Sequence, residues 1–225
     1  MHDDLAKQLT ATTAHFYEDQ GDPFAKTRSY TWNEEKVISP LITPGMTVVD
    51  VGAGNGRFAR TLIDKQVTYI GIEPSARLRA AADVGQEMRE GALPHLAIED
   101  ASADVTVCFA VLHHIPTDEQ RQAAISELIR ITKPGGSLIA SSWYLPAEDG
   151  RCVPIIDADP GDVWVPWKMD GSLTQRYVHR MQPGEWTALW TRPDLRIQQI
   201  GLFGKTDWTT DEQEARNWFV IAHRI

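Results

Sequence analysis

The chain has 225 residues, of which 42% are hydrophobic and 24% are charged, and its formal net charge is −9 at pH 7. This length suits one α/β domain with some elaboration better than two full domains. The acidic balance repels a polyanion at long range, which argues against unaided nucleic-acid binding but leaves room for a local basic surface.

Three features bear on location. The longest apolar runs are far shorter than the about 20 residues that a membrane-spanning helix needs. The polar, acidic N-terminus does not resemble a secretory signal. Two cysteines, Cys108 and Cys152, are too few for a disulfide framework or a cysteine-based zinc site. Cys108 lies in an apolar run, which predicts a buried free thiol. We therefore expect a cytoplasmic protein.

Helices and strands alternate through most of the chain. Residues 3–18 and 33–42 have helical periodicity. Strands are expected at 47–51, 68–73, 105–111 and 137–143, with helices at 57–65, at 75–83, and from a capping box at 117–120 to the Lys133-Pro134-Gly135-Gly136 stop. A helix at 183–190 and strands at 195–202 and 217–224 complete the pattern. Such alternation predicts a mostly parallel, doubly wound sheet.

Three glycines follow the first predicted strand in the pattern Asp50-x-Gly52-x-Gly54-x-Gly56. Glycine lets the backbone turn sharply and approach a ligand closely. The spacing is GxGxG, whereas dinucleotide-binding loops usually have GxGxxG. Glu73 ends the second strand, where an acid can accept hydrogen bonds from ribose hydroxyls. The pattern favours a nucleoside-containing ligand, with a plain strand-to-helix turn and a nucleotide-binding oxidoreductase as alternatives.

In this order, the segments VVDVGAGNGR, IGIEPS, ADVTVCFAVLHHI and ITKPGG resemble motifs of the class I S-adenosylmethionine-dependent methyltransferases. The resemblance implies a Rossmann-like sheet of seven strands ending in an antiparallel hairpin. It implies one domain over 1–225, with a helical cap at 1–45 and an insertion near the acceptor site at 145–182. It also implies S-adenosyl-L-methionine as cofactor and S-adenosyl-L-homocysteine as product. The implied cofactor-binding residues are Asp50, Gly52, Ala53, Gly54, Asn55, Gly56, Arg57, Glu73, Pro74, Ala92 and Ala110.

A second resemblance covers segments outside the cofactor motifs. Phe24-Ala25-Lys26-Thr27-Arg28, Trp32, Asp162-x-x-Val165-Pro166-Trp167 and Arg176-Tyr177-x-His179 resemble the eukaryotic tRNA wobble-uridine carboxymethyl methyltransferases, the Trm9 type that includes the methyltransferase domain of AlkB homologue 8. Those enzymes esterify the 5-carboxymethyl group of a wobble uridine. The resemblance implies tRNA as substrate and a small zinc-binding activator protein as partner.

To esterify a carboxylate, an enzyme needs to position it against the methyl donor and does not need a strong base, because the carboxylate is already a nucleophile. Arginine holds a carboxylate through a bidentate fork. We therefore expect Arg28, Arg176 and His114 to hold the acceptor carboxylate as the catalytic set. An exposed surface arginine is the plain alternative for Arg28, and a backbone hydrogen bond is the plain alternative for His114.

Two further patterns, a histidine pair and a set of tryptophans, predict structural roles. The pair His113-His114 does not predict a metal site, because adjacent side chains at a strand end point apart and no third ligand is evident. Trp164, Trp167 and Trp190 are expected to pack in the interior, with one of them available to stack on a base.

Two other functions stay open at this point. One is a methyltransferase for a small carboxylate or hydroxyl metabolite, for which the net charge of −9 is more natural. The other is a cofactor-binding protein without catalysis that regulates a partner. A positive rim around the pocket would favour RNA, whereas a closed apolar pocket would favour a metabolite.

Overall fold

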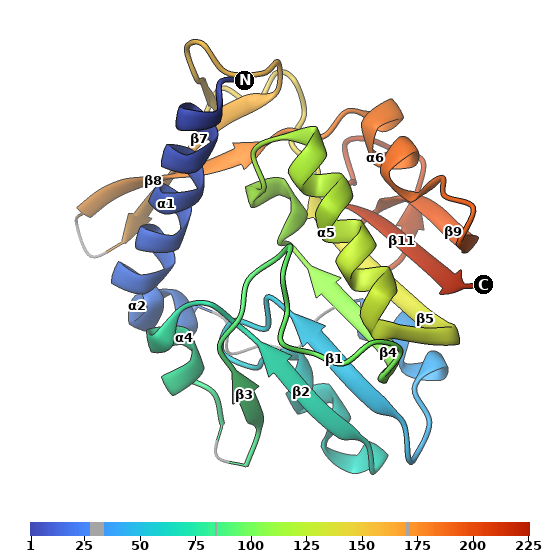
Figure 1. Cartoon of the computed structure of the whole chain (residues 1–225). Coiled ribbons are helices and arrows are strands. Elements are labelled where there is room, and N and C mark those ends of the chain that lie inside the picture. The colour runs from blue at the N-terminus through green and yellow to red at the C-terminus, as the bar shows by residue number, and fades with distance from the viewer. Residues whose placement is uncertain (28–33, 84, 170–171) are drawn as a thin grey trace.

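The computed structural model describes residues 1–27, 34–83, 85–169 and 172–225. Its main sheet has the order β10-β9-β11-β5-β4-β1-β2-β3 (Figure 1). The strands are β1 (Thr47–Val51), β2 (Thr68–Ile72), β3 (Glu87–Arg89), β4 (Ala103–Phe109), β5 (Thr132–Trp143), β9 (Leu195–Phe203), β10 (Trp208–Thr209) and β11 (Asn217–Arg224). The pairs from β3 to β5 are parallel, whereas β11 is antiparallel to both β5 and β9. The predicted mostly parallel sheet with a C-terminal hairpin is confirmed, and the short β10 adds an eighth strand.

The helical elements mostly follow the sequence periodicity. They are α1 (Asp3–Asp19), α2 (Gly21–Lys26), α3 (Glu35–Ile38), η1 (Ser39–Leu41), η2 (Phe58–Lys65), α4 (Ala76–Ala80), η3 (Leu112–His114), α5 (Asp118–Ile131) and α6 (Pro183–Trp190). The segment after the glycine loop, η2, is a 3-10 helix where an α-helix was expected. Thr117 accepts a hydrogen bond from the backbone of Gln120, which confirms the predicted start of α5.

Strand β5 begins earlier than expected. Thr132 pairs with Ala103 and Ser137 pairs with Val105, so the register shifts between these two pairs. The segment Lys133-Pro134-Gly135-Gly136, which was expected to lie before the strand, therefore lies within it and forms a local irregularity like a β-bulge.

Side chains alternate between the two faces of the sheet and build a core on each. Val49 and Cys108 pack on the face covered by α5 and α6. Val48 and Val107 pack on the opposite face, against α3, η1 and η2. Cys108 is fully buried and free, as predicted. Both faces are thus filled, which leaves the carboxyl edge of the parallel strands as the place for a ligand.

The insertion after β5 contains regular structure that the sequence pattern did not show. The strands β6 (Val153–Pro154), β7 (Asp162–Met169) and β8 (Ser172–His179) form a separate antiparallel sheet. Helix α1 packs against β8 and against α4, so it connects this small sheet to the carboxyl edge of β2 (Figure 1). In the described part of the chain, every helix is too short or too polar to cross a membrane.

Candidate active site

A cavity of about 850 Å³ lies at the carboxyl ends of β1, β2 and β4. This size is typical of small-molecule sites. Residues from α1 and α2 contribute to its wall together with the glycine loop. Of the residues expected to bind cofactor or acceptor, the wall contains Gly52, Ala53, Gly54, Asn55, Arg57, Glu73, Pro74, Ala92, Ala110 and His114. The sequence motifs therefore meet in one place.

The glycine loop uses two of its glycines in different ways. Gly52 has φ +78°, and a Cβ atom there would come within 2.2 Å of the Val111 side chain. Gly54 has φ +58°, and a Cβ atom there would meet no other atom within 4 Å. Gly52 is thus needed for close packing, whereas Gly54 leaves the backbone open to a ligand in the cavity.

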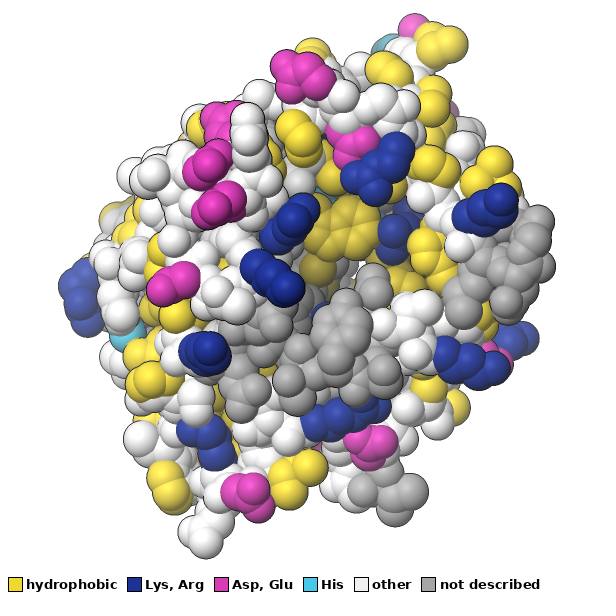
Figure 2. All heavy atoms as spheres, turned by 180° about the vertical axis from the view of Figure 1, so that it is seen from behind, with side chains coloured by type: hydrophobic (Ala, Val, Ile, Leu, Met, Phe, Trp, Pro, Cys, Tyr) yellow, Lys and Arg dark blue, Asp and Glu magenta, His cyan; other side chains and the backbone are white. Residues whose placement is uncertain are grey.

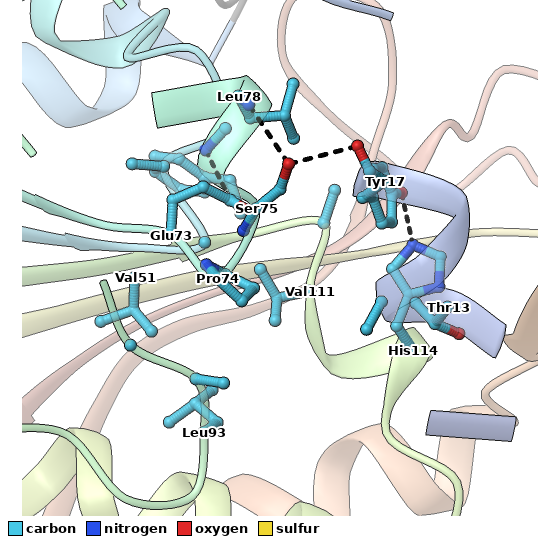
Figure 3. A pocket seen from close by; sticks show the side chains of 18 of the residues that line it. Thr13, Tyr17, Val51, Glu73, Pro74, Ser75, Leu78, Leu93, Val111 and His114 are labelled. Carbon is cyan, nitrogen blue, oxygen red and sulfur yellow. Dashed lines mark hydrogen bonds between the residues drawn. The ribbon is translucent and has the colours of Figure 1, made fainter. Parts of the chain in front are cut away.

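Glu73 is fixed at one end of the cavity (Figure 3). Its side chain is only 5% exposed, and its two oxygens accept hydrogen bonds from the backbone N–H groups of Gly54 and Ser75, both at 2.9 Å. Burial raises the pKa of Glu73, and these N–H groups partly offset that effect. A carboxylate has further lone pairs beyond these two bonds, so Glu73 can accept the hydroxyl groups of a ribose.

Asp50 and Gly56 lie outside the cavity wall, unlike the rest of their motif. Asp50 is buried below the loop and accepts a hydrogen bond of 2.8 Å from the Tyr69 hydroxyl, so it connects β1 to β2. Burial raises the pKa of Asp50 to about 7. A Cβ atom on Gly56 would lie 1.9 Å from Oε1 of Gln86. Direct ligand contact was expected for both residues, whereas their observed contacts support the loop from beneath.

His114 lies on the opposite wall, next to Tyr17 of α1 (Figure 3). Its Nδ1 is 2.8 Å from the backbone oxygen of Tyr177, and its Nε2 is 2.8 Å from the Tyr17 hydroxyl. Burial, followed by the positive charge of Arg176, lowers the pKa of His114 to about 3. The ring is therefore neutral at neutral pH. The bond to the Tyr177 backbone oxygen is the one that the plain alternative for His114 predicts, and its expected part in holding the acceptor carboxylate stays a prediction.

Arg176 is buried behind this wall and does not line the cavity itself. Its guanidinium carbon lies 4.6 Å from the ring centroid of Trp143 and 5.2 Å from that of Phe16. Trp143 does line the cavity. Stacking of a planar cation on aromatic rings fixes both partners. Arg28, which was expected in the catalytic set, and Trp32, which is part of the second resemblance, lie outside the described residues.

The histidine pair differs from expectation in its geometry. His113 and His114 belong to the 3-10 helix η3, not to the end of the strand, and their ring centroids are only 4.2 Å apart. The expectation that the side chains of His113 and His114 point apart, as neighbours in a strand do, was therefore wrong. His113 is fully buried, stacks on Trp143 at 4.6 Å and accepts a hydrogen bond from the Trp143 backbone N–H at 3.2 Å. It thus supports Trp143 from behind.

Comparisons with known proteins agree with this geometry. Residues 49–140 match the family model described as a methyltransferase domain. A solved S-adenosylmethionine-dependent methyltransferase of Methanosarcina mazei has a similar fold, with a TM-score of 0.69 over 84% of this chain and 97% of that one, at 20% identity. The chain is therefore similar to a methyltransferase domain over residues 49–140, and its fold is that of the solved methyltransferase.

Two curated relatives of this chain carry the same name, tRNA (carboxymethyluridine(34)-5-O)-methyltransferase. The protein of Arabidopsis thaliana is 30% identical over 59% of this chain, which spans only 33% of that protein. The protein of Schizosaccharomyces pombe is 24% identical over 92% of this chain and 94% of its own length. A further similar structure, at 18% identity and a TM-score of 0.62, is a complex of the Haloferax volcanii Trm112 methyltransferase activator with a methyltransferase; the match covers 94% of this chain and 97% of that one.

Several residues of the cavity wall were not predicted as site residues from the sequence, among them Tyr17, Glu34 and Trp143. Glu34 is 5% exposed and accepts a hydrogen bond of 2.9 Å from Asn217, and burial raises its pKa against the opposing charge of Arg57. All three lie outside residues 49–140 of the methyltransferase domain model. The position of Trp143, directly at the carboxyl end of a buried strand, is the one local signal that points to the site.

Proposed function

We propose that this chain is an S-adenosyl-L-methionine-dependent methyltransferase that esterifies the 5-carboxymethyl group of a tRNA wobble uridine. Its relatives of that name support the proposal. The chain spans a third of the Arabidopsis relative, so its own residues have to support the same activity.

The cavity fits the cofactor. Glu73 would hold the ribose, the open backbone at Gly54 would lie beside the methionine part, and Ala92 would border the adenine. Asn55 and Arg57 line the same cavity, and Arg57 would face the methionine carboxylate. When bound, S-adenosyl-L-methionine supplies a methyl group on a positively charged sulfur and leaves as S-adenosyl-L-homocysteine.

The protonation state of His114 is the observation that favours a carboxylate over a hydroxyl group as methyl acceptor. A hydroxyl acceptor needs a base whose pKa lies near the working pH. His114 faces the acceptor side, and its pKa of about 3 makes it a poor base at neutral pH. A carboxylate has no proton to lose when it is methylated. The site is therefore better suited to an acid than to an alcohol, and it has to position that acid and shield it from water.

A local basic surface supports an RNA-borne acid over a free metabolite. Figure 2 shows Lys and Arg side chains around a hollow in which hydrophobic side chains are visible. Such a surface attracts a polyanion at short range even though the net charge is −9. We further propose that a small zinc-binding activator protein joins the chain, since a similar structure contains a methyltransferase activator. The cytoplasmic location stays a prediction.

A comparison of acceptors tests this proposal. Anticodon stem-loop RNAs would carry 5-carboxymethyluridine, or the matching 5-(2-hydroxyethyl)uridine, at the wobble position. They would be incubated with labelled S-adenosyl-L-methionine, with and without an activator protein, beside a panel of free small acids. We expect label in the carboxymethyl RNA alone. Label in the hydroxyethyl RNA would contradict the argument from His114, and label only in a free acid would favour the metabolite alternative. Cofactor binding without transfer to any acceptor would favour a regulatory partner protein.

A further inference from the structure

Ser75 connects the first helix of the chain to the Glu73 end of the cavity (Figure 3). Its hydroxyl oxygen accepts a hydrogen bond of 3.2 Å from the Leu78 backbone N–H and so caps α4. Its backbone N–H donates to Oε1 of Glu73 at 2.9 Å. Ser75 is only 4% exposed. The serine therefore helps to fix the carboxyl group that is proposed to hold the ribose.

The hydroxyl proton of Ser75 is directed to helix α1. Two acceptors on that helix lie within hydrogen-bond distance of the Ser75 hydroxyl: Oε2 of Glu18 at 2.9 Å and the backbone oxygen of Tyr17 at 3.2 Å. A hydroxyl has one proton, and a carboxylate at the shorter distance is the stronger acceptor. The bond from Ser75 is the largest cause of the lowered pKa of Glu18, which is therefore ionised at neutral pH. Ser75 thus donates to a charged group.

Glu18 acts on Glu73 in two opposite ways. Through Ser75 it holds the N–H group from which Glu73 accepts a hydrogen bond. Its negative charge also raises the pKa of Glu73, which disfavours the charged form of that acid. A glutamine at position 18 would keep an oxygen that can accept from Ser75 but would remove the charge. Substitution can therefore separate the hydrogen bond from the charge.

We propose that Glu18 is a positioning residue for the cofactor, which holds Ser75 so that Glu73 meets the ribose hydroxyl groups. This inference rests on the proposed function, because that function places the ribose at Glu73. Glu18 belongs to α1, which packs against α4 and lies wholly outside residues 49–140 of the methyltransferase domain model. The N-terminal helix is then part of what gives the chain its affinity for a nucleoside.

The test compares S-adenosyl-L-homocysteine with its 2′,3′-dideoxy analogue, which lacks both ribose hydroxyl groups. Calorimetry on the whole chain measures binding without turnover. For the wild type we expect the analogue to bind about 100-fold more weakly, because it loses hydrogen bonds to a charged group. In Glu18→Ala the two ligands should differ by only about tenfold, because Glu73 is less well placed. Ser75→Ala interrupts the same connection and should give a similar ratio, whereas Glu18→Gln should restore the ratio to within about threefold of the wild type.

The matched control is Asp22→Ala. Asp22 of α2 pairs with Arg77 of α4 at 3.4 Å, so it joins the N-terminal helices to α4 through an exposed ion pair that does not involve Ser75. Such a pair contributes little, and this variant should keep the wild-type ratio of about 100.

The possible results separate the inference from the proposed function. A merely structural part for Glu18 would weaken both ligands equally in Glu18→Ala and leave the ratio near 100, which would overturn the inference. A Glu18→Gln variant with the low ratio of Glu18→Ala would also overturn it. Equal wild-type affinities for the two ligands would overturn the inference and the ribose contact of Glu73, but not the choice of methyl acceptor. Absence of S-adenosyl-L-homocysteine binding to the wild type would overturn the proposed function and the inference together.

Discussion

The two ends of the cavity are built in different ways. The proposed cofactor end consists of the glycine loop after β1 and the Glu73 turn after β2, which are neighbouring parallel strands. The proposed acceptor end combines α1, η3 and β5 in its wall with β8 behind it, and these segments are more than 150 residues apart at the extremes. The first end depends on backbone geometry within about 25 residues. The second exists only once the small sheet and α1 have packed together. We therefore expect substitutions at the two ends to separate cofactor binding from methyl transfer.

The largest effect should come from Glu73→Ala. This change removes the acceptor of two backbone N–H groups and the proposed ribose contact, and hydrogen bonds to a charged group contribute about 1.5–3 kcal/mol each. We expect cofactor affinity to fall by about 100-fold in calorimetry. Glu87→Ala is the control, since Glu87 pairs with Arg89 on an exposed strand away from the cavity. Unchanged cofactor affinity in the Glu73→Ala variant would contradict the proposal that the cofactor binds at this end of the cavity.

Arg176→Lys should act on the acceptor end. Lysine keeps the charge but loses the planar group that stacks on Trp143 and Phe16. We expect methyl transfer to fall by about 30-fold while cofactor affinity stays within about twofold of the wild type. Arg151→Lys is the control, because Arg151 is an exposed arginine of the same insertion that pairs with Asp149. Equal losses of cofactor binding and transfer would show that the two ends are not separable.

Gly54→Ala should weaken the cofactor end more mildly. At φ +58° an alanine costs about 1 kcal/mol, and its methyl group would occupy open cavity. We expect about a tenfold loss of cofactor affinity with the fold retained. Gly150→Ala, at another position where a Cβ meets no atom within 4 Å but φ is not in the left-handed region, should change nothing measurable. Similar affinities for the two variants would argue against a ligand over Gly54.

The smallest expected effect is on the pH dependence of thermal stability, through His114. Its folded-state pKa of about 3 lies below the ordinary value of 6.5, so the unfolded chain takes up a proton that the folded chain does not. The stability contribution is therefore full above pH 6.5 and is lost as the pH falls toward 3. The His114→Gln variant has no imidazole to protonate at this position, so it should not lose this stability as the pH falls. We expect its melting temperature to fall by a few degrees less than that of the wild type between pH 6.5 and pH 5.5, measured by calorimetry. Parallel curves for the two proteins would contradict the neutral, buried state of His114.

The sequence predicted that the glycine loop and Glu73 lie together because these signals are local. A strand, a GxGxG loop and an acid at the next strand end dictate neighbouring positions in any parallel sheet. Asp50 and Gly56 share that spacing yet lie outside the cavity wall, since spacing alone does not say which side of a loop faces the ligand. The main sheet was predicted for the same reason, from alternating strands and helices.

The acceptor end was predicted only in fragments. His114 and Arg176 were identified by resemblance, but not the neutrality of the histidine or the burial of the arginine behind Trp143. These properties arise from long-range packing of β8 against η3 and α1. Tyr17 belongs to a segment, Phe16-Tyr17, that shares the second resemblance, but neither Tyr17 nor Trp143 was given a part in the site. Their place in the site depends on tertiary contacts that have no period or spacing in the sequence.

The most direct test of the central claim is the product itself. Whole tRNA bearing 5-carboxymethyluridine would be incubated with the protein, an activator protein and S-adenosyl-L-methionine carrying a labelled methyl group, then digested and examined by nucleoside mass spectrometry. We expect the labelled methyl ester of 5-carboxymethyluridine, and much less of it from the Glu73→Ala protein. Label on another nucleoside, or no label on tRNA under conditions in which the cofactor binds, would contradict it.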